Sequence, residues 1–225
     1  MMYTVIIPAA GQGRRMGCGH NKVFLEVDGI PVIRRTVEVF QAHAACSAIY
    51  LAAKEDEIGQ LTTLLHDFPK VRGIIAGGSE RQYSIYNVLK VIPKTDIVMV
   101  HDGARPFISH ETLDALYESA LNNRAAIAAV PAKDTVKVVV DGQVSSTPER
   151  STLWLTQTPQ AFTYDVLLTA YQRAEADGFL GTDDASLVER TGVIVHVAQG
   201  SYDNIKLTTP EDLYFAAALL KKRGI

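Results

Sequence analysis

Short apolar runs alternate along the chain with longer segments in which apolar residues recur every three or four positions. The short runs are typical of strands buried inside a sheet, and the longer segments are typical of helices with one apolar face. The runs that we predict to be strands are Thr4–Ile7, Ala48–Ala53, Gly73–Ala76, Ile97–Val100, Ala126–Val130 and Val193–Val197.

The segments between these runs are predicted to be helices. Pro31 can open the first one, because proline suits the first helical turn, and Ile33, Val37 and Phe40 then share one face. Acidic residues begin the last helix and basic residues end it, which complements the helix dipole. The other predicted helices are Glu55–Leu65, Ser79–Ile92, Ser109–Leu121 with Ser109 as N-cap, and the segment from Thr209 to Gly224.

Strands and helices that alternate in this way predict an α/β fold, a Rossmann-like and mostly parallel sheet covered by helices on both faces. Ligands of such folds bind at the carboxyl ends of the strands, in the loops that follow them. A length of 225 residues suits one such domain, so we expect a single domain over residues 1–225.

The segment at about residues 133–157 breaks the alternation. Two extended runs flank Asp141–Gly142, and Asp-Gly between extended runs is a strong signal for a β-hairpin. Such a hairpin does not easily continue a parallel sheet. We therefore expect it to project from the core as an arm.

Composition and charge exclude several classes of protein. Apolar residues make up 47% of the chain and charged residues 21%, as in ordinary globular proteins. The net charge of 22 − 25 = −3 gives no general attraction for nucleic acid or anionic membrane. Cys18 and Cys46 form no CxxC pair, which argues against a zinc site and fits a reducing compartment. No run approaches the roughly 18 apolar residues of a membrane span, so we expect a cytoplasmic protein.

The first predicted strand is followed by a loop of small residues with basic residues close behind. The backbone of Pro8–Gly13 can approach a phosphate chain, and Arg15 and Lys22 would supply positive charge. A tight turn with solvated basic residues is the alternative. The loop is not a Walker A motif, and Met16 stands where a dinucleotide fingerprint needs a small residue, which disfavours a dehydrogenase.

Other polar residues follow strands at the same expected edge. Asp102 could hold a ribose hydroxyl or help to place Mg²⁺, or serve only as a turn residue. Arg105 could bind a phosphate or simply pair with Asp102. His101 fits a packed, hydrogen-bonded role better than that of a base, and Asp183-Asp184 fits the start of a helix better than a metal site.

The loop Ala9-Ala10-Gly-x-Gly-x-Arg15-Met, followed by Lys22, resembles the signature of nucleotidyltransferases that act on sugar and alditol phosphates. Further blocks along nearly the whole chain are similar, in order and spacing, to those of the 2-C-methyl-D-erythritol 4-phosphate (methylerythritol phosphate) cytidylyltransferases of the non-mevalonate isoprenoid pathway. These blocks are Gly77–Ser84, His101–Pro106, Thr158–Phe162, Thr182–Ser186 and Asp203–Lys206.

The resemblance implies that the chain transfers CMP from CTP to methylerythritol phosphate and releases pyrophosphate. Arg15 and Lys22 would stabilise charge at the α-phosphate. Mg²⁺ or another divalent cation would be bound mainly through the CTP phosphates, with Asp102 as a possible ligand. Family members are homodimers in which the hairpin arm reaches across to the partner's site, so we expect a homodimer with exchanged arms.

The resemblance also implies binding roles for individual residues. The backbones of Ala9, Ala10 and Gly11 would line the nucleotide. The cytosine would be contacted by Gly78, Ser79 and Ser84. The ribose side and the second substrate would be held by Asp102, Ala104 and Arg105. Contacts to methylerythritol phosphate or to the nucleotide phosphates are implied for Thr135, Thr158 and Thr182, and catalytic contacts for Arg150 and Lys206 as well as Arg15 and Lys22. The chain departs from the family at Ser79, where Asp is frequent, and at Gly19-His20-Asn21, which replaces a common Pro-containing approach to Lys22.

Two alternatives to this function stay open at this point. A ribitol-5-phosphate cytidylyltransferase shares the loop and the chemistry, although Ala9-Ala10, in place of the usual Ala-Gly, and Thr182–Ser186 argue against it. A non-catalytic nucleotide-binding domain would tolerate the loss of Arg15 and Lys22, yet both are present.

Overall fold

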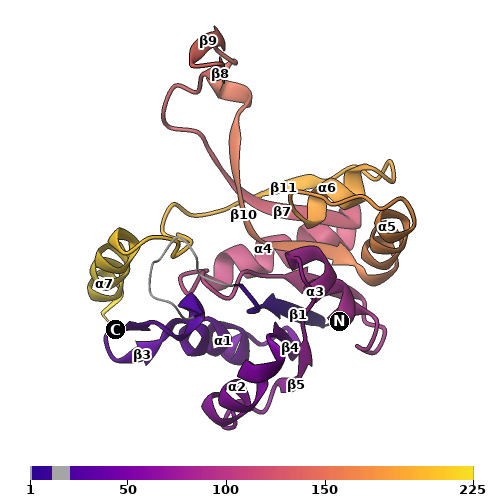
Figure 1. Cartoon of the computed structure of the whole chain (residues 1–225), viewed down its shortest axis with the longest axis vertical. Coiled ribbons are helices and arrows are strands. Elements are labelled where there is room, and N and C mark those ends of the chain that lie inside the picture. The colour runs from indigo at the N-terminus through magenta and orange to yellow at the C-terminus, as the bar shows by residue number, and fades with distance from the viewer. Residues whose placement is uncertain (1, 12–20, 225) are drawn as a thin grey trace.

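The computed structural model of the chain describes residues 2–11 and 21–224. A seven-stranded sheet lies at its centre, with the strand order β11-β7-β10-β6-β1-β4-β5 (Figure 1). Strand β10 is antiparallel to its neighbours β6 and β7, and the other neighbouring strands are parallel. The strands are β1 (Tyr3–Pro8), β4 (Cys46–Ala53), β5 (Val71–Ala76), β6 (Ile97–Val100), β7 (Ala125–Pro131), β10 (Trp154–Thr163) and β11 (His196–Gln199).

The predicted strands are therefore confirmed, but the central strand β10 is missing from the prediction. Its sequence contains Pro159, and a proline argues against a central strand because it cannot donate a hydrogen bond to the ladder. In the structure, the register between β10 and β7 shifts between Thr156 and Gln160. Pro159 lies inside this irregularity, so the strand can hold a central place on either side of it. The last strand, β11, also begins later than predicted, at His196.

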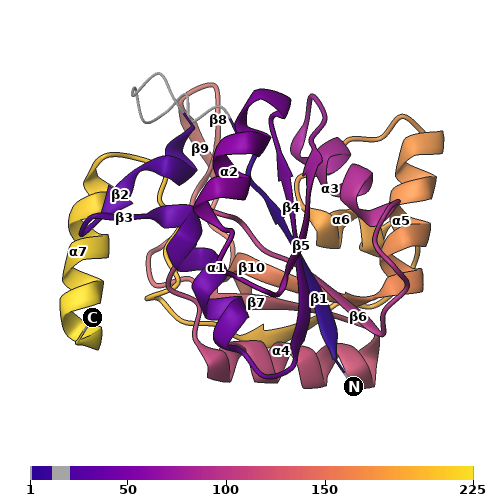
Figure 2. The ribbon, with the colours of Figure 1, turned by 90° about the horizontal axis from the view of Figure 1, so that it is seen from below.

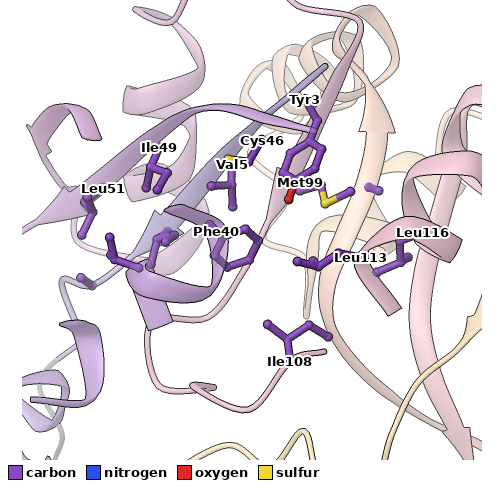
Figure 3. Packing of buried hydrophobic residues seen from close by; sticks show 14 of the residues in the cluster. Tyr3, Val5, Phe40, Cys46, Ile49, Leu51, Met99, Ile108, Leu113 and Leu116 are labelled. Atoms are coloured by element: carbon purple, nitrogen blue, oxygen red, sulfur yellow. The ribbon is translucent and has the colours of Figure 1, made fainter. Parts of the chain in front are cut away.

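Helices cover both faces of the sheet, as expected (Figure 2). Helices α1 (Val32–Ala42), α2 (Ile58–Leu64) and α4 (His110–Asn123) cover one face, and α3 (Arg81–Leu89), α5 (Tyr164–Ala176) and α6 (Asp184–Glu189) cover the other. On the first face, Phe40 of α1 and Leu113 of α4 belong to one buried cluster with Val5, Ile49 and Met99 of the sheet (Figure 3). The two apolar layers fix the strands, and so fix the loops at their ends.

The helix ends follow the signals in the sequence. Helix α1 starts directly after Pro31, and the Ser109 side chain accepts a hydrogen bond from the backbone N–H of Thr112 at the start of α4. The last helix, α7 (Glu211–Arg223), ends at Gly224, whose φ of 69° favours glycine. Helix α5 was not among the predicted helices. The other short elements among the described residues are β2 (Glu26–Val27), β3 (Ile30–Pro31) and the 3₁₀ turns η2 (Lys22–Phe24), η3 (Glu55–Glu57) and η4 (Arg150–Thr152).

The expected hairpin is present and stands away from the sheet (Figure 1). Its strands β8 (Val138–Val140) and β9 (Gln143–Ser146) pair antiparallel. Asp141 and Gly142 join them with φ angles of 49° and 77°, as the tightest hairpin turns require. The hairpin carries exposed apolar side chains, among them Val140 and Val144. Within residues 2–11 and 21–224, no helix has the length and apolarity to cross a membrane.

Candidate active site

A cavity of about 550 Å³ opens at the carboxyl edge of the parallel strands. Its walls come from the loops that follow β1, β4, β5 and β6, which parallel pairing brings to the same edge. Most of the residues that the sequence suggested for the nucleotide meet here. They are Ala9, Ala10, Gly11, Lys22, Gly78, Ser79, Ser84, Asp102 and Ala104, together with Lys206.

A second cavity of about 380 Å³ adjoins the first, because Arg81, Asp102 and Lys206 line both. The second cavity also contains Arg105, Thr158 and Thr182, which the sequence suggested for the second substrate. The structure therefore brings these two groups of expected residues into neighbouring spaces, with a charged junction between them.

The loop after β5 is held in place by its own glycines and by Ser84. The Ser84 hydroxyl accepts a hydrogen bond from the Gly78 N–H at 3.0 Å and donates one to the Glu80 carbonyl at 3.0 Å. A side chain at Gly78 would place its Cβ 2.5 Å from the Cβ of Tyr83, and one at Gly77 would place it 2.9 Å from the Cβ of Ala10. Glycine at position 77 therefore lets this loop lie against the loop after β1, and glycine at position 78 lets it pack against the first turn of α3.

Asp102 is the centre of the charged junction. One carboxylate oxygen lies 2.8 Å from Lys206 Nζ and 3.5 Å from Arg105 Nε, and the other lies 3.4 Å from Arg81 Nε. Burial alone would raise the pKa of Asp102, but the charges of Arg81, Lys206 and Arg105 outweigh it and hold the pKa below its usual range. Three cations face Asp102 and Asp184, the second carboxylate that Arg81 contacts, so the junction keeps a net positive charge, which suits an anionic ligand.

Arg81 has no role in the sequence-based assignment, although it lies in both cavities. Its guanidinium also reaches Asp184, with 2.8 Å between Nη2 and Oδ2. Asp184 is 1% exposed and also accepts a hydrogen bond from the Tyr171 hydroxyl. The sequence did offer a signal for this role, because Arg81 lies within the block Gly77–Ser84 that resembles the family.

The prediction that Asp183-Asp184 lies at the start of a helix is correct, since both residues begin α6. Asp183 caps α6, since its carboxylate accepts a hydrogen bond from the Ser186 N–H at 2.9 Å. Asp184 is the first residue of α6, and its buried side chain also pairs with Arg81. The sequence alone could not distinguish the roles of the two side chains, because the direction of the Asp184 side chain depends on helix α3 and on Tyr171.

His101 is fully buried and packed, as predicted. Its Nε2 lies 2.9 Å from the Arg105 carbonyl oxygen, and its Nδ1 lies 3.2 Å from the Thr158 hydroxyl. Burial lowers its pKa to about 4, so the ring is neutral at physiological pH. The Thr158 hydroxyl also accepts a hydrogen bond from the Asp102 N–H at 3.0 Å. His101 thus orders the loop that carries Asp102.

Two expected site residues lie on the arm. Within the described part of the chain, Thr135 and Arg150 are exposed and lie outside both cavities. Arg150 donates a hydrogen bond to the Lys133 carbonyl at 3.2 Å. Arg15 lies outside the described residues, whereas Lys22 lines the first cavity.

The described residues do not by themselves form a metal cage. No cluster of three or more His, Cys, Asp or Glu side chains among them could hold a metal ion. Asp102 is the acidic side chain that lines both cavities, and its oxygens already face three cations. Mg²⁺ is commonly bound by one or two carboxylates together with substrate phosphates. The junction around Asp102 could therefore hold Mg²⁺ only if substrate phosphates supply most of the ligands of the ion.

Comparison with known proteins agrees with the geometry. Residues 3–222 match the family model described as 2-C-methyl-D-erythritol 4-phosphate cytidylyltransferase. A protein of that name from Bacillus licheniformis is 53% identical over 98% of this chain and 96% of its own length. One from Geobacter metallireducens is 46% identical over 99% of both chains. The solved 4-diphosphocytidyl-2C-methyl-D-erythritol synthase of Anaerococcus prevotii matches with a TM-score of 0.88 and 33% identity, over 98% of this chain and 96% of its own.

Proposed function

The chain belongs to the 2-C-methyl-D-erythritol 4-phosphate cytidylyltransferase family, and from that premise we propose how its residues carry out the reaction. The enzyme transfers CMP from CTP to methylerythritol phosphate and releases pyrophosphate, a step of isoprenoid biosynthesis. The family and the names of the relatives favour this acceptor over ribitol 5-phosphate, and they favour an enzyme over a non-catalytic nucleotide-binding domain.

The larger cavity binds CTP in this proposal. The backbones of Ala9, Ala10 and Gly11 lie along the nucleotide, and the tightly packed loop at Gly78 and Ser79 meets the base. The support for this placement is the close approach of the two loops, which leaves backbone groups rather than bulky side chains at the wall. Backbone N–H groups at such a wall are suitable donors for phosphate or base oxygens.

The smaller cavity binds methylerythritol phosphate, with Arg105, Thr158 and Thr182 as contacts. The observation that carries the proposal is the shared junction of Arg81, Asp102 and Lys206. A phosphate of the second substrate at this junction would meet Lys206 and lie next to the nucleotide. Asp102 pairs with Lys206, and the Arg105 guanidinium donates to the Asn204 carbonyl, so both cations are ordered before the substrate arrives.

The reaction is an in-line attack at phosphorus. An oxygen of the 4-phosphate forms a bond to the α-phosphorus of CTP, and the bond from that phosphorus to the bridging oxygen breaks. The electron pair of the broken bond leaves with pyrophosphate, and the attacking phosphate is already ionised and needs no base. Lys22, together with Arg15, stabilises the charge that develops at the α-phosphate, so the protein contributes positioning and electrostatics.

A divalent cation, with Mg²⁺ as the expected one, would neutralise phosphate charge when it is bound. Asp102 is the residue that could add a ligand to those of the phosphates, because it lines both cavities. The roles assigned here to Lys22, Arg105 and Lys206 do not depend on that ligand.

The arm supports a homodimer in which each subunit completes the other's site. Thr135 and Arg150 lie away from the cavities of their own chain, and the valines of β8 and β9 are exposed. We place Arg150 of one subunit at the methylerythritol phosphate of the other, with the exposed valines in the contact between subunits. The continuous seven-stranded sheet supports a single nucleotidyltransferase domain over residues 1–225, and the low number of cysteines, two in the chain, supports a cytoplasmic location.

The test is pyrophosphate release by the purified protein with CTP and each alditol phosphate in turn. We expect turnover with methylerythritol phosphate and little with ribitol 5-phosphate. Equal or faster turnover with ribitol 5-phosphate would contradict the acceptor, and wild-type turnover by Lys22→Ala would contradict the role of Lys22.

A further inference from the structure

The residues on both sides of segment 12–20 are joined by the side chain of Asn21. Ala9, directly after β1, is 1% exposed, and its N–H donates a hydrogen bond to the Ala52 carbonyl of β4 at 2.7 Å. The Asn21 side-chain N–H donates to the Ala9 carbonyl. Asn21, the residue before Lys22, is therefore hydrogen-bonded to Ala9, the residue that follows β1.

Both the NH₂ group and the oxygen of the Asn21 side-chain amide form hydrogen bonds. Nδ2 donates to the Ala9 carbonyl and, at 2.7 Å, to Oε2 of Glu57, while Oδ1 accepts from the Val23 N–H at 3.3 Å. This last bond caps the 3₁₀ turn that begins at Lys22. Asn21 is 1% exposed, so water does not replace these partners.

Glu57 connects this amide to the wall of the larger cavity. Its other carboxylate oxygen lies 3.1 Å from Nζ of Lys54, and the Glu57 side chain is only 13% exposed. Lys54 directly follows β4 and lines the larger cavity. A series of contacts therefore joins Ala9, after β1, to Lys54, after β4, through Asn21 and Glu57. Lys22 is the residue that follows Asn21 in the chain.

We infer that Asn21 and Glu57 are positioning residues for Lys22: they fix the turn that carries this lysine relative to the nucleotide cavity. The inference rests on the proposed role of Lys22 in the reaction. Asn21 is the N-cap of the 3₁₀ turn that begins at Lys22, with an extended backbone at φ −66° and ψ 122°. Here the buried amide supplies that geometry through contacts on three sides.

Loss of this support should reduce turnover less than loss of Lys22 itself. A displacement of about 1 Å of a positioned group can cost on the order of 10²-fold in rate, so we expect Asn21→Ala to lower kcat by about 10- to 10²-fold. The KM for methylerythritol phosphate should stay nearly unchanged, because its proposed cavity is lined by other residues. Glu57→Ala should lower kcat in the same direction, and Glu57→Gln less, because its amide oxygen can still accept from Asn21.

The decisive experiment combines each substitution with Lys22→Ala. If Asn21 and Glu57 act through Lys22, adding Asn21→Ala or Glu57→Ala to Lys22→Ala should cause no further loss of kcat. A merely structural role would lower kcat by the same factor in both backgrounds. Thermal unfolding of every variant is measured beside the kinetics, and the Glu57 pair keeps the test valid if Asn21→Ala does not fold.

Asn123→Ala is the matched control. Its side-chain amide also donates to a backbone carbonyl, that of Ser119 in α4, at 3.0 Å, but it lies away from the cavities. It should leave kcat unchanged. Wild-type kcat in folded Asn21→Ala, while Lys22→Ala is impaired, would overturn the inference alone. Wild-type kcat in Lys22→Ala would overturn the proposed role of Lys22 and this inference with it.

Discussion

Asp184 and Asp165 form ion pairs of the same length in opposite surroundings. Asp184 lies 2.8 Å from Arg81 with 1% of its side chain exposed, and Asp165 lies 2.8 Å from Lys94 with 68% of its side chain exposed. Each can be changed to alanine, which removes the carboxylate and little apolar contact. The two substitutions therefore compare a buried, hydrogen-bonded ion pair with an exposed one.

The structure sets the expected size of each effect. Asp184→Ala leaves the buried Tyr171 hydroxyl without its acceptor and removes one of the two carboxylates that Arg81 contacts. Breaking a buried pair from one side costs about 3–5 kcal/mol. Because Arg81 keeps Asp102 and its side chain is 33% exposed, we expect the lower end, about 3 kcal/mol. Asp165→Ala should cost less than about 1 kcal/mol, since both partners are solvated.

The assay is urea unfolding of the wild type and both variants at one pH, with thermal unfolding as a second measurement. A loss of about 3 kcal/mol corresponds to a Tm lower by about 6–12 °C for a chain of this size. Equal losses for the two variants, or a loss below about 1 kcal/mol for Asp184→Ala, would refute the reasoning that burial makes this pair costly to break.

Three further predictions concern the site. The pKa of His101 is about 4 in the fold and about 6.5 when unfolded, so stability should fall by about 3 kcal/mol as pH drops through this window, and by less in His101→Gln, measured by urea unfolding. Arg15→Ala and Lys22→Ala should each lower kcat by about 10²–10³-fold with little change in Tm, and near-wild-type turnover would contradict their roles. Arg150→Ala and Lys206→Ala, each impaired alone, should recover about a quarter of wild-type activity after co-refolding, since about half of the dimers are mixed and each has one intact site. No rescue, with mixed dimers shown to form, would rule out an arm that serves the partner's site.

Much of the fold could be predicted because its signals are local. Apolar runs such as Ile97–Val100 are buried in the sheet, and Ser109 and Gly224 mark the helix ends where expected. Strand β10 could not be predicted in the same way. Its proline argues against a central strand, and only the register shift against β7 makes room for that residue.

The site was predictable where a motif lies at the end of a strand, and less so where partners come from distant segments. Lys22 and Asp102 stand in such motifs, and both line the larger cavity. The bridge from Arg81 to Asp184 joins positions 103 residues apart, and the contact of Asn21 with Glu57 joins positions 36 apart. No local pattern encodes these pairs, because packing of the helices onto the sheet brings them together.

The place of β10 in the sheet also determines when strand pairing can be completed during synthesis. The chain emerges from its N-terminus, and β1, β4, β5 and β6 can pair with one another once residue 100 has been made. Strand β7 follows at residues 125–131, but both of its neighbours, β10 and β11, come later in the chain. Until β10 is released, the growing protein therefore carries β7 without a neighbour and β6 with one open edge. This interval is when a nascent chain is most exposed to pairing with other strands, and it ends only when the antiparallel strand enters the centre of the sheet.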